Sequence, residues 1–431
     1  MRWRCPRRPS FPCSNWKSRV TGLYVHVPFC VSKCAYCDFY SLADQTDLVP
    51  AYIDAVLAEA QTYAGMSFDT LYLGGGTPSL LGVANLEKLV RGLKDDFDFS
   101  RLAEATIEVN PESASEDLLR TALGLGFSRV SVGVQSLSDH ELQSVGRVHT
   151  AAQAVEAVSR VVGMGFRDVS ADVIVGLPGQ MQGGVSHPHH EPLPSKERRD
   201  SPSPGGRELE GGGVRGGFEG GSANGPVGSL THTLEKLIGL GVNHLSVYCL
   251  SLEHGTPLAT NQPDDLPSDD LQADLFEGAH TVLEQKGFVH YEISNFCLPG
   301  RECQHNLNYW RGGEYLGLGP AAASHLGGRR WKNRADLLAY LRYPAGVVDE
   351  VEELSAKEKA AEEAMLRLRL LVEGLSADEM VRRFGEDSTV GLLSRLNGLV
   401  AERLLTCDGA KYRLARSRVL TSNSILARVL E

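Results

Sequence analysis

The stretch Leu23-Tyr-Val-His-Val-Pro-Phe-Cys30-Val-Ser-Lys-Cys34-Ala-Tyr-Cys37 places three closely spaced cysteines directly after an apolar, strand-like run. Three thiolates in a C-x3-C-x2-C loop suit a four-iron cubane, because they ligate three irons and leave the fourth open. An open metal position is where chemistry takes place. Zinc is the alternative, but it usually takes four ligands in two pairs, and the chain has no second C-x2-C. A chance group of core cysteines is the remaining interpretation.

Composition and charge limit the classes of function. The 431 residues predict one large and one smaller domain. The net charge of −11 argues against a general nucleic-acid binder. The nine cysteines, at positions 5, 13, 30, 34, 37, 249, 297, 303 and 407, show no paired framework, which indicates a reducing compartment. No apolar run of about 18 residues occurs, so we expect no integral membrane protein.

Residues 1–22 form a basic leader with six Lys or Arg and no acidic residue. One interpretation is an organellar transit segment. The other is a disordered or misannotated leader, and Pro6, Pro9 and Pro12 favour it because they interrupt an amphipathic helix. We therefore expect a cytoplasmic protein, with the mitochondrial or plastid matrix as the alternative.

Short apolar runs alternate with longer helical patterns from residue 23 onward. The predicted strands are 23–27, 70–73, 105–109, 129–134, 168–175 and 244–250, and the predicted helices lie near 48–64, 84–94, 115–125, 151–165 and 229–240. This alternation predicts an α/β fold of parallel βα units. Six units are too few for a closed eight-fold barrel, so we expect a partial (β/α)6 TIM-like barrel, with an extension, over 23–345. Reactive groups of such folds follow the carboxyl ends of the strands, as the cysteine loop does.

Two further segments differ in character. Residues 181–224 are rich in Gly, Pro, Ser and His and cannot bury enough apolar surface to order themselves, so they are interpreted as an insertion or a gene-model artefact. The triplet His187, His189 and His190 is interpreted as solvated, with metal binding as the alternative.

A helix near 267–287, a strand at 288–293 and a loop with Cys297, Cys303 and His305 are expected next. Residues 346–431 predict three helices, a small hairpin and a last helix, which suggests a winged-helix-like domain.

Ordered motifs extend this interpretation along the chain. They are Tyr24-Val-His-Val-Pro-Phe-Cys30, Gly74-Gly-Gly-Thr-Pro78, Glu108-Val-Asn-Pro111, Gly133-Val-Gln-Ser136 and Gly176-Leu-Pro-Gly179. Together with the cysteine loop they resemble the coproporphyrinogen-oxidase-like branch of the radical S-adenosylmethionine (SAM) superfamily. Ser294-Asn-Phe-Cys297 and His305-Asn-Leu-Asn-Tyr-Trp310 are similar to its heme-chaperone (HemW-like) subgroup. The resemblance covers the chain from residue 23 onward, except for 181–224.

The resemblance implies a [4Fe-4S] cluster on Cys30, Cys34 and Cys37, with SAM bound to the open iron and cleaved by one electron. The cofactor brings this chemistry and the protein positions it. The implied SAM-binding residues are Tyr24, Tyr36, Gly75, Gly76, Thr77, Glu108, Gln135, Arg147 and Asp172. Taken singly, each has a plainer explanation, such as a tight turn, a solvated carboxylate, a surface arginine or a core aromatic. His26 is interpreted as a core histidine.

A heme site is implied by the HNxxYW motif. Histidine and cysteine both serve as axial ligands of heme iron, so His305, Cys303 and Tyr309 are the candidates. A hydrogen-bonded structural histidine is the alternative for His305.

Two departures favour a chaperone over an oxidase. Oxygen-independent coproporphyrinogen oxidases carry a fourth cysteine where this chain has Phe39, and they have a longer arm before the cluster. The stretch Ala321-Ala-Ala323 stands after Gly319, where the family has a small-residue stretch, and the cofactor contacts of that stretch stay open here. The expected function is a heme chaperone that hands heme to acceptor proteins, including membrane-bound respiratory complexes, and takes electrons from a donor. Its rival is an oxygen-independent coproporphyrinogen III oxidase.

Overall fold

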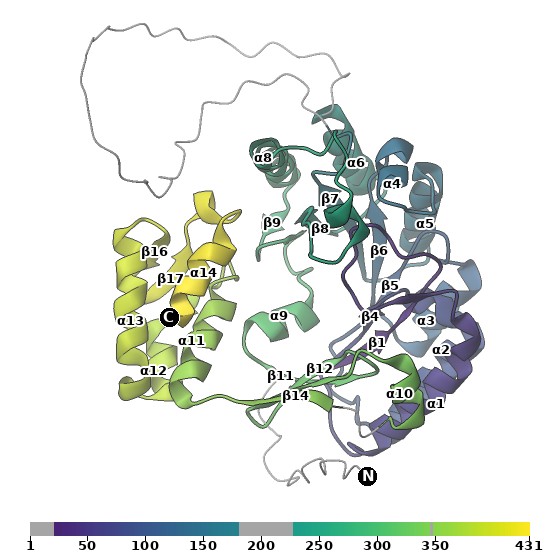
Figure 1. Ribbon diagram of the computed structural model, residues 1–431, viewed down its shortest axis with the longest axis horizontal. Coiled ribbons are helices and arrows are strands. Elements are labelled where there is room, and N and C mark those ends of the chain that lie inside the picture. The colour runs from purple at the N-terminus through teal and green to yellow at the C-terminus, as the bar shows by residue number, and fades with distance from the viewer. Residues whose placement is uncertain (1–20, 181–226, 345–347) are drawn as a thin grey trace, which may run out of the picture.

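The structure is a computed structural model, and it describes residues 21–180, 227–344 and 348–431. Most of the predicted leader and the whole predicted insertion at 181–224 lie outside these ranges. The predicted α/β class is correct, because helices cover the outer face of one large mixed sheet (Figure 1).

The sheet contains twelve strands in the part of the chain that the structure describes. Its seven central strands are parallel and lie in the order β11, β1, β4, β5, β6, β7 and β8. Their bounds are Glu314–Leu318 for β11, Thr21–Val27 for β1, Thr70–Gly75 for β4, Glu104–Val109 for β5, Arg129–Gln135 for β6, Asp168–Val175 for β7 and His244–Cys249 for β8. Parallel strands are buried on both faces and read as continuous apolar runs, which is why the six predicted strands match β1 and β4 to β8.

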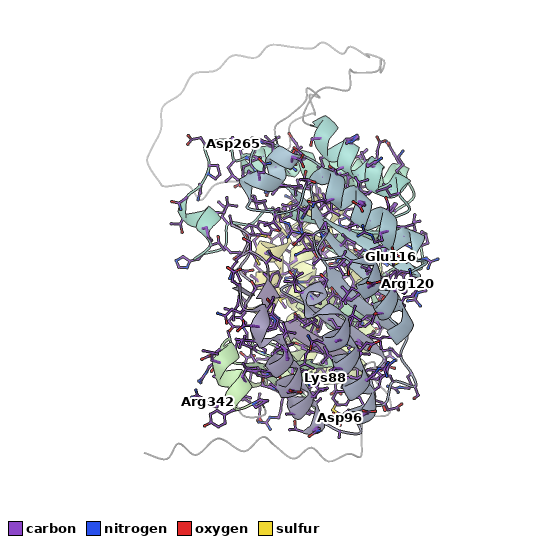
Figure 2. The ribbon with its side chains drawn as sticks, turned by 90° about the vertical axis from the view of Figure 1, so that its right-hand side faces the viewer. Lys88, Asp96, Glu116, Arg120, Asp265 and Arg342 are labelled. Atoms are coloured by element: carbon purple, nitrogen blue, oxygen red, sulfur yellow. The ribbon has the colours of Figure 1, made fainter. Side chains whose placement is uncertain are left out.

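Helices follow the parallel strands as the βα pattern predicts. They are α1 (Val49–Gln61), α2 (Gly82–Asp96), α3 (Glu116–Leu125), α4 (Asp139–Ser144), α5 (Ala151–Gly163), α6 (Val227–Gly239) and α8 (Asp269–Gln285). Side-chain caps start three of these helices: Ser115 accepts a hydrogen bond from the backbone N–H of Leu118 in α3, Thr150 from that of Gln153 in α5, and Ser268 from that of Leu271 in α8. Charged side chains such as Lys88, Glu116 and Arg120 cover the outward surface (Figure 2).

Antiparallel strands extend both edges of the sheet, which the sequence did not predict. On one edge β12 (Ala323–Leu326), β13 (Arg329–Asn333) and β14 (Val348–Glu353) follow β11. On the other, β10 (Asn295–Cys297) pairs with β8 and with β9 (Val289–His290). The predicted strand at 288–293 is thus only two residues long. The predicted loop around His305 is also wrong, since residues Gln304–Trp310 form helix α9.

The carboxylate of Glu59 fixes the β11–β14 edge to helix α1. It is fully buried and accepts hydrogen bonds from the backbone N–H of Gly319 at 3.0 Å, from Asn333 Nδ2 at 2.9 Å and from the Tyr340 hydroxyl at 2.6 Å. Tyr340 belongs to α10 (Leu337–Arg342). A buried carboxylate with three donors holds these segments firmly, because losing any one donor leaves a desolvated charge less compensated.

The last elements form a separate layer beside the edge strands (Figure 1). They are α11 (Ala356–Arg367), β15 (Leu375–Ser376), α12 (Ala377–Phe384), α13 (Glu386–Ala401), β16 (Leu405–Asp408), β17 (Lys411–Leu414) and α14 (Ser422–Leu430). The strands β15, β17 and β16 make a small antiparallel sheet. The predicted helices and hairpin of this region are therefore present.

Candidate functional site: the cysteine loop, its hydrogen-bonded frame and an adjoining cleft

The cysteine loop is clamped where it leaves strand β1. The short parallel pair β2 (Phe29–Cys30) and β3 (Leu42–Ala43) closes its base. Within the loop, the backbone N–H of Cys37 donates to the carbonyl oxygen of Cys34 at 3.2 Å, and that of Ala35 donates to Val145 at 3.0 Å. The thiols of Cys30, Cys34 and Cys37 are free and half-buried. The three cysteines that the sequence singled out therefore lie on one clamped loop.

The three thiols of this loop are the donor set of a cubane that binds one iron through each thiolate. Among the described residues no three His, Cys, Asp or Glu side chains converge on one metal-ion position. Each thiolate of a cubane binds a different iron, so its sulfur atoms need not converge on one point. Burial, followed by the neighbouring Cys34 and Cys30, raises the pKa of the Cys37 thiol, although the backbone N–H of Phe39 opposes this. A bound cationic centre reverses that tendency because it deprotonates its thiol ligands.

A continuous set of hydrogen bonds links two of the thiols. Thr77 Oγ1 donates to Cys30 Sγ at 3.6 Å, and Asn110 Nδ2 donates to Thr77 Oγ1 at 3.0 Å. Arg147 Nη2 donates to Asn110 Oδ1 at 2.9 Å, and its Nη1 lies 3.6 Å from Cys34 Sγ. This frame orients Thr77 and Arg147, two predicted cofactor residues. Asn110 was missed as a site residue although its motif was recognised, because an Asn after a strand is a common turn residue.

Arg147 has the features of an anion-binding residue. Its Nη2 also donates to the carbonyl oxygen of Gly133 at 2.7 Å, which fixes the guanidinium plane. Its Nε is buried and has no hydrogen-bond partner in the described part of the chain. Buried polar groups are nearly always paired, so such an atom indicates a missing ligand. The carboxylate of SAM is a group of the right chemistry.

The glycines after β4 allow a close backbone approach. A Cβ on Gly76 would lie 2.7 Å from the carbonyl oxygen of Phe29 and 2.8 Å from that of Val27. Gly75 has φ +109°, and a Cβ there would lie 2.6 Å from the His26 ring. These glycines are therefore required by the packing of β4 against the start of the cysteine loop. A contact of Gly75 or Gly76 with the amino group of SAM remains a prediction.

Two predicted carboxylates, those of Glu108 and Asp172, line a small cavity of about 40 Å³. Glu108 accepts hydrogen bonds from the Tyr72 hydroxyl at 2.7 Å and the Gly75 backbone N–H at 3.1 Å. Ser131 Oγ donates to Asp172 Oδ1 at 3.1 Å. Burial raises the pKa of Glu108 to about 7 and that of Asp172 to about 6. Both carboxyls can thus change protonation near neutral pH, as groups that meet a ligand often do.

Gln135 and Tyr36 are two further residues that were predicted to bind SAM. Gln135 ends β6 with φ +66°, a left-handed conformation that costs a non-glycine residue about 1–2 kcal/mol. Strain of this kind persists where the surrounding structure demands it, frequently at ligand sites. Tyr36 hydrogen-bonds to Cys34 and packs against Val145 and Ile174, and burial raises its pKa.

His305 and Cys303 do not form an open heme-ligand site. His305 Nδ1 hydrogen-bonds to Thr70 Oγ1 at 2.8 Å, and Nε2 hydrogen-bonds to the Tyr309 hydroxyl at 2.9 Å. The ring is buried, and burial lowers its pKa to about 3. Cys303 is equally buried, with its thiol donating to Glu104 at 3.4 Å. Both ring nitrogens of His305 are therefore in use, so the geometry supports the structural alternative for this histidine.

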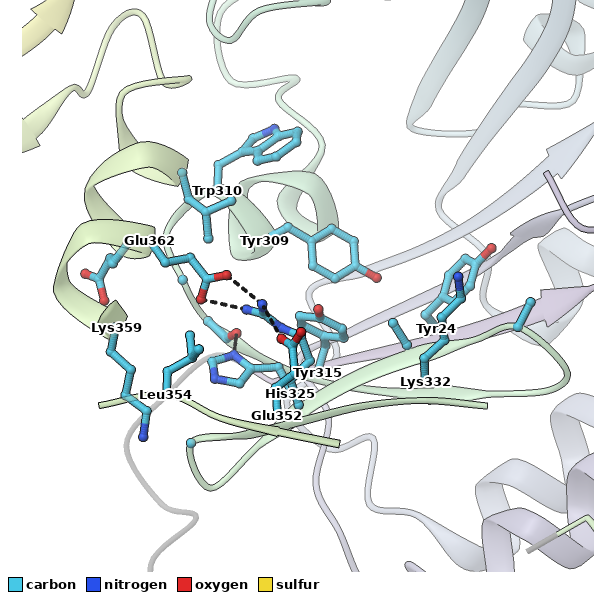
Figure 3. Close-up of a pocket in the computed structure, with 18 of the residues that line it drawn as sticks. Tyr24, Tyr309, Trp310, Tyr315, His325, Lys332, Glu352, Leu354, Lys359 and Glu362 are labelled. Atoms are coloured by element: carbon cyan, nitrogen blue, oxygen red, sulfur yellow. Dashed lines mark hydrogen bonds and ion pairs between the residues drawn. The ribbon is translucent and has the colours of Figure 1, made fainter. Parts of the chain in front are cut away.

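A cleft of about 1110 Å³ adjoins the cysteine loop (Figure 3). It lies between the strands β11–β14 on one side and helices α9, α11 and α12 on the other. Its lining includes Tyr24, His26, Phe39, Tyr309, Trp310 and His325. Tyr24 lines this cleft, with its hydroxyl 3.0 Å from His26 Nδ1, and its place beside the cofactor stays a prediction. The cleft went unrecognised from the sequence because its edge strands were not predicted.

Comparisons with known proteins agree with this site. The family model of the radical SAM superfamily matches residues 24–183, which contain the cysteine loop and most of its frame. The heme chaperone HemW of Mycobacterium tuberculosis is 33% identical over 81% of both chains. That of Escherichia coli is 30% identical over 94% of this chain and 97% of its own. The structure of the radical SAM enzyme coproporphyrinogen III oxidase (HemN) from Escherichia coli has the same fold, with a TM-score of 0.76 at 22% identity, covering 96% of this chain and 91% of that one.

The fold and the three-cysteine loop define a radical SAM protein. Within that superfamily, the chain belongs to the HemW family. No helix among the described residues is long and apolar enough to cross a membrane.

Proposed function

We propose that this protein is a radical SAM-type heme chaperone, which binds heme and transfers it to heme-dependent proteins. The observation that carries the proposal is its alignment with a curated heme chaperone over nearly the full length of both chains. The cleft supports it, because its volume of about 1110 Å³ slightly exceeds the usual range of small-molecule sites, roughly 300–1,000 Å³, and so leaves room for a large ligand.

The cofactor roles follow from the frame around the cysteine loop. Cys30, Cys34 and Cys37 would hold a [4Fe-4S] cluster, and Arg147 would neutralise the carboxylate of SAM. When bound, cluster and SAM supply one-electron chemistry, and an electron donor is then a necessary partner. The chain's own residues position these groups: Thr77 and Arg147 donate toward the sulfur atoms of Cys30 and Cys34. Glu108 offers a carboxylate for ribose hydroxyls.

Phe39 favours transfer over oxidative decarboxylation. It stands where the related oxidases have a fourth cysteine, it is 62% exposed and it lines the cleft. An exposed aromatic ring at a cleft mouth suits contact with a flat macrocycle, whereas it offers no thiol for redox or acid chemistry. The rival function is that of an oxygen-independent coproporphyrinogen III oxidase, which would use the same cluster- and SAM-binding residues.

The rest of the assignment is equally a proposal. The parallel strands would form a partial TIM-like barrel over residues 23–345, and residues 346–431 a winged-helix-like domain. Acceptors would be heme proteins, including membrane-bound respiratory complexes. The protein would act in the cytoplasm, with an organelle matrix as the alternative location.

Two assays on the same cluster-reconstituted sample test the function. In the first, heme-loaded protein is mixed anaerobically with an apo-heme protein, and the acceptor's heme spectrum and activity are followed. In the second, SAM, reductant and coproporphyrinogen III are added and protoporphyrinogen is measured. Heme transfer without product supports the chaperone. Product formation would make the protein an oxidase, and a sample that binds no heme would overturn the proposal.

A further inference from the structure

One face of the edge strands forms the floor of the cleft. Side chains alternate between faces along a strand, and opposed residues share a face. His325 pairs with Tyr315 on β11 and with Arg330 on β13, and Ala323 pairs with Lys332. All five residues line the cleft (Figure 3). The floor thus places one histidine between a tyrosine and an arginine, with the small side chain of Ala323 beside them.

His325 is held in the tautomer that binds metal. Its Nδ1–H donates to the carbonyl oxygen of Gly313 at 3.2 Å, and a carbonyl can only accept, so Nε2 carries the free lone pair. Nε2 has no hydrogen-bond partner among the residues that the structure describes. A histidine that ligates metal almost always donates its other N–H to a carbonyl or carboxylate in this way. Burial lowers the pKa of His325, which keeps the ring neutral.

The two other histidines near the cleft are not available. His26 Nε2 lies 2.7 Å from the carbonyl oxygen of Tyr40, and its Nδ1 hydrogen-bonds to the Tyr24 hydroxyl. His305 has partners on both nitrogens, as described above. Of these three histidines, His325 alone offers an unshared nitrogen within the described residues.

Several cationic side chains line the cleft. Arg330 donates to both carboxylate oxygens of Glu362, at 2.5 and 2.8 Å. Arg383 pairs with Glu363. Lys332 lies on the floor opposite Ala323, its side chain is exposed, and its positive charge acts on His26. The two arginines therefore neutralise acidic residues of α11, and Lys332 and Lys359 are further cations of the cleft that can meet an anion.

An occupant must match a neutral imidazole, a flat aromatic lining and the cationic side chain of Lys332. An iron porphyrin has an iron for the imidazole, a flat conjugated ring for tyrosine and tryptophan side chains, and carboxylates at its edge. We propose that heme binds in this cleft with Nε2 of His325 as an axial iron ligand and Lys332 as the partner of a propionate. This rests on the proposed function and deepens it, because it moves the heme ligand from the HNxxYW motif to the edge strands.

The test is a hemin titration of full-length, cluster-loaded protein, read as difference spectra against the same protein without hemin. Wild type is compared with His325→Gly and with His232→Ala, which replaces an exposed histidine of α6 outside the cleft. We expect His325→Gly to change the Soret position and weaken binding at least about tenfold, as loss of a metal's supporting partner already costs 10–100-fold. Added imidazole should restore the wild-type spectrum in His325→Gly, which a purely structural role would not allow. His232→Ala should match wild type.

A second comparison tests the lysine. Lys332→Glu should weaken hemin binding several-fold, yet leave binding of hemin dimethyl ester unchanged because its propionates carry no charge. An equal loss with both porphyrins would overturn the role of Lys332.

Different results would contradict His325 as the heme ligand and the proposed heme-chaperone function. Wild-type protein that binds no hemin contradicts the proposed function. Wild-type and His325→Gly proteins with the same spectrum and affinity contradict the ligand. If His325→Gly does not fold, judged by circular dichroism, His325→Met replaces it, and an unchanged heme spectrum in that variant is the contradicting outcome.

Discussion

Replacing Glu108 with glutamine should flatten the pH dependence of stability near neutrality. Burial raises the pKa of Glu108 in the folded protein to about 7, whereas an unfolded glutamate titrates near about 4.3. Between these values the folded state holds a proton that the unfolded state has released. Stability therefore falls as pH rises through this window.

The size of the effect follows from the width of that window. One pH unit is worth about 1.4 kcal/mol for a proton bound in only one state. Glu108 should thus account for a loss of about 3 kcal/mol between pH 4.5 and 7 as an upper value. A glutamine side chain has no proton to lose in this range, so the variant lacks this contribution. Asp172, whose pKa is raised to about 6, acts in the same direction in both proteins and largely cancels in their difference.

The assay is guanidinium denaturation of the metal-free protein at a series of pH values from about 5 to 8. Glutamine places an N–H₂ near the donors Tyr72 and Gly75, so the variant should be less stable at every pH. This loss of stability is the same at every pH, so it does not change how steeply the free energy of unfolding varies with pH. If the free energy of unfolding has the same pH slope in wild type and Glu108→Gln, the buried carboxyl does not titrate as argued.

Three further outcomes are expected. Cys34→Ser should abolish the brown absorption of the reconstituted cluster, because a thiolate ligand is required; full absorption would refute the ligand assignment. Arg147→Ala should lower SAM affinity in equilibrium dialysis at least about tenfold by removing a charge-assisted contact, and Arg147→Lys should recover only part of it; unchanged affinity in both would exclude the contact. Arg129→Ala should lower the free energy of unfolding by about 3–5 kcal/mol, since the fully buried Glu104 loses its partner at 3.0 Å. Unfolding curves that match wild type would show that Glu104 is compensated elsewhere.

The parallel strands and the cysteine loop were predictable because their signals are local. Each strand is a continuous apolar run followed by a helical pattern, and the three cysteines lie within eight residues. Burial on both faces makes such strands easy to recognise without tertiary information.

Helix α9 was not predictable, because its stabilising contacts are not local. The backbone N–H groups of Gln304 and His305 donate to the carboxylate of Glu104, at 3.2 and 3.1 Å. A helix start needs acceptors for its first N–H groups, and here a residue of strand β5 supplies them. No capping signal therefore appears beside residues 304–310.

The cleft could not be predicted from the sequence either, because its walls also depend on contacts between distant segments. Strands β12 and β13 have polar residues on their open face, so their sequences lack the apolar runs that mark a strand. His325 stands in such a strand. The proposed role of His325 depends on Gly313, which accepts its Nδ1–H, and on the neighbours Tyr315 and Arg330, which only strand pairing places opposite it.

The pairing of β1 with β11 has a consequence for biosynthesis. Thr21 lies opposite Glu314 and Val25 opposite Leu318, so the strand that carries the cysteine loop receives its second neighbour only late in translation. At roughly 5–20 residues per second, the ribosome needs on the order of tens of seconds to reach that neighbour. During this interval the thiols have emerged but their supporting sheet is incomplete. A truncated product that ends before β11 therefore lacks one of the two neighbours of the strand that carries the cysteine loop.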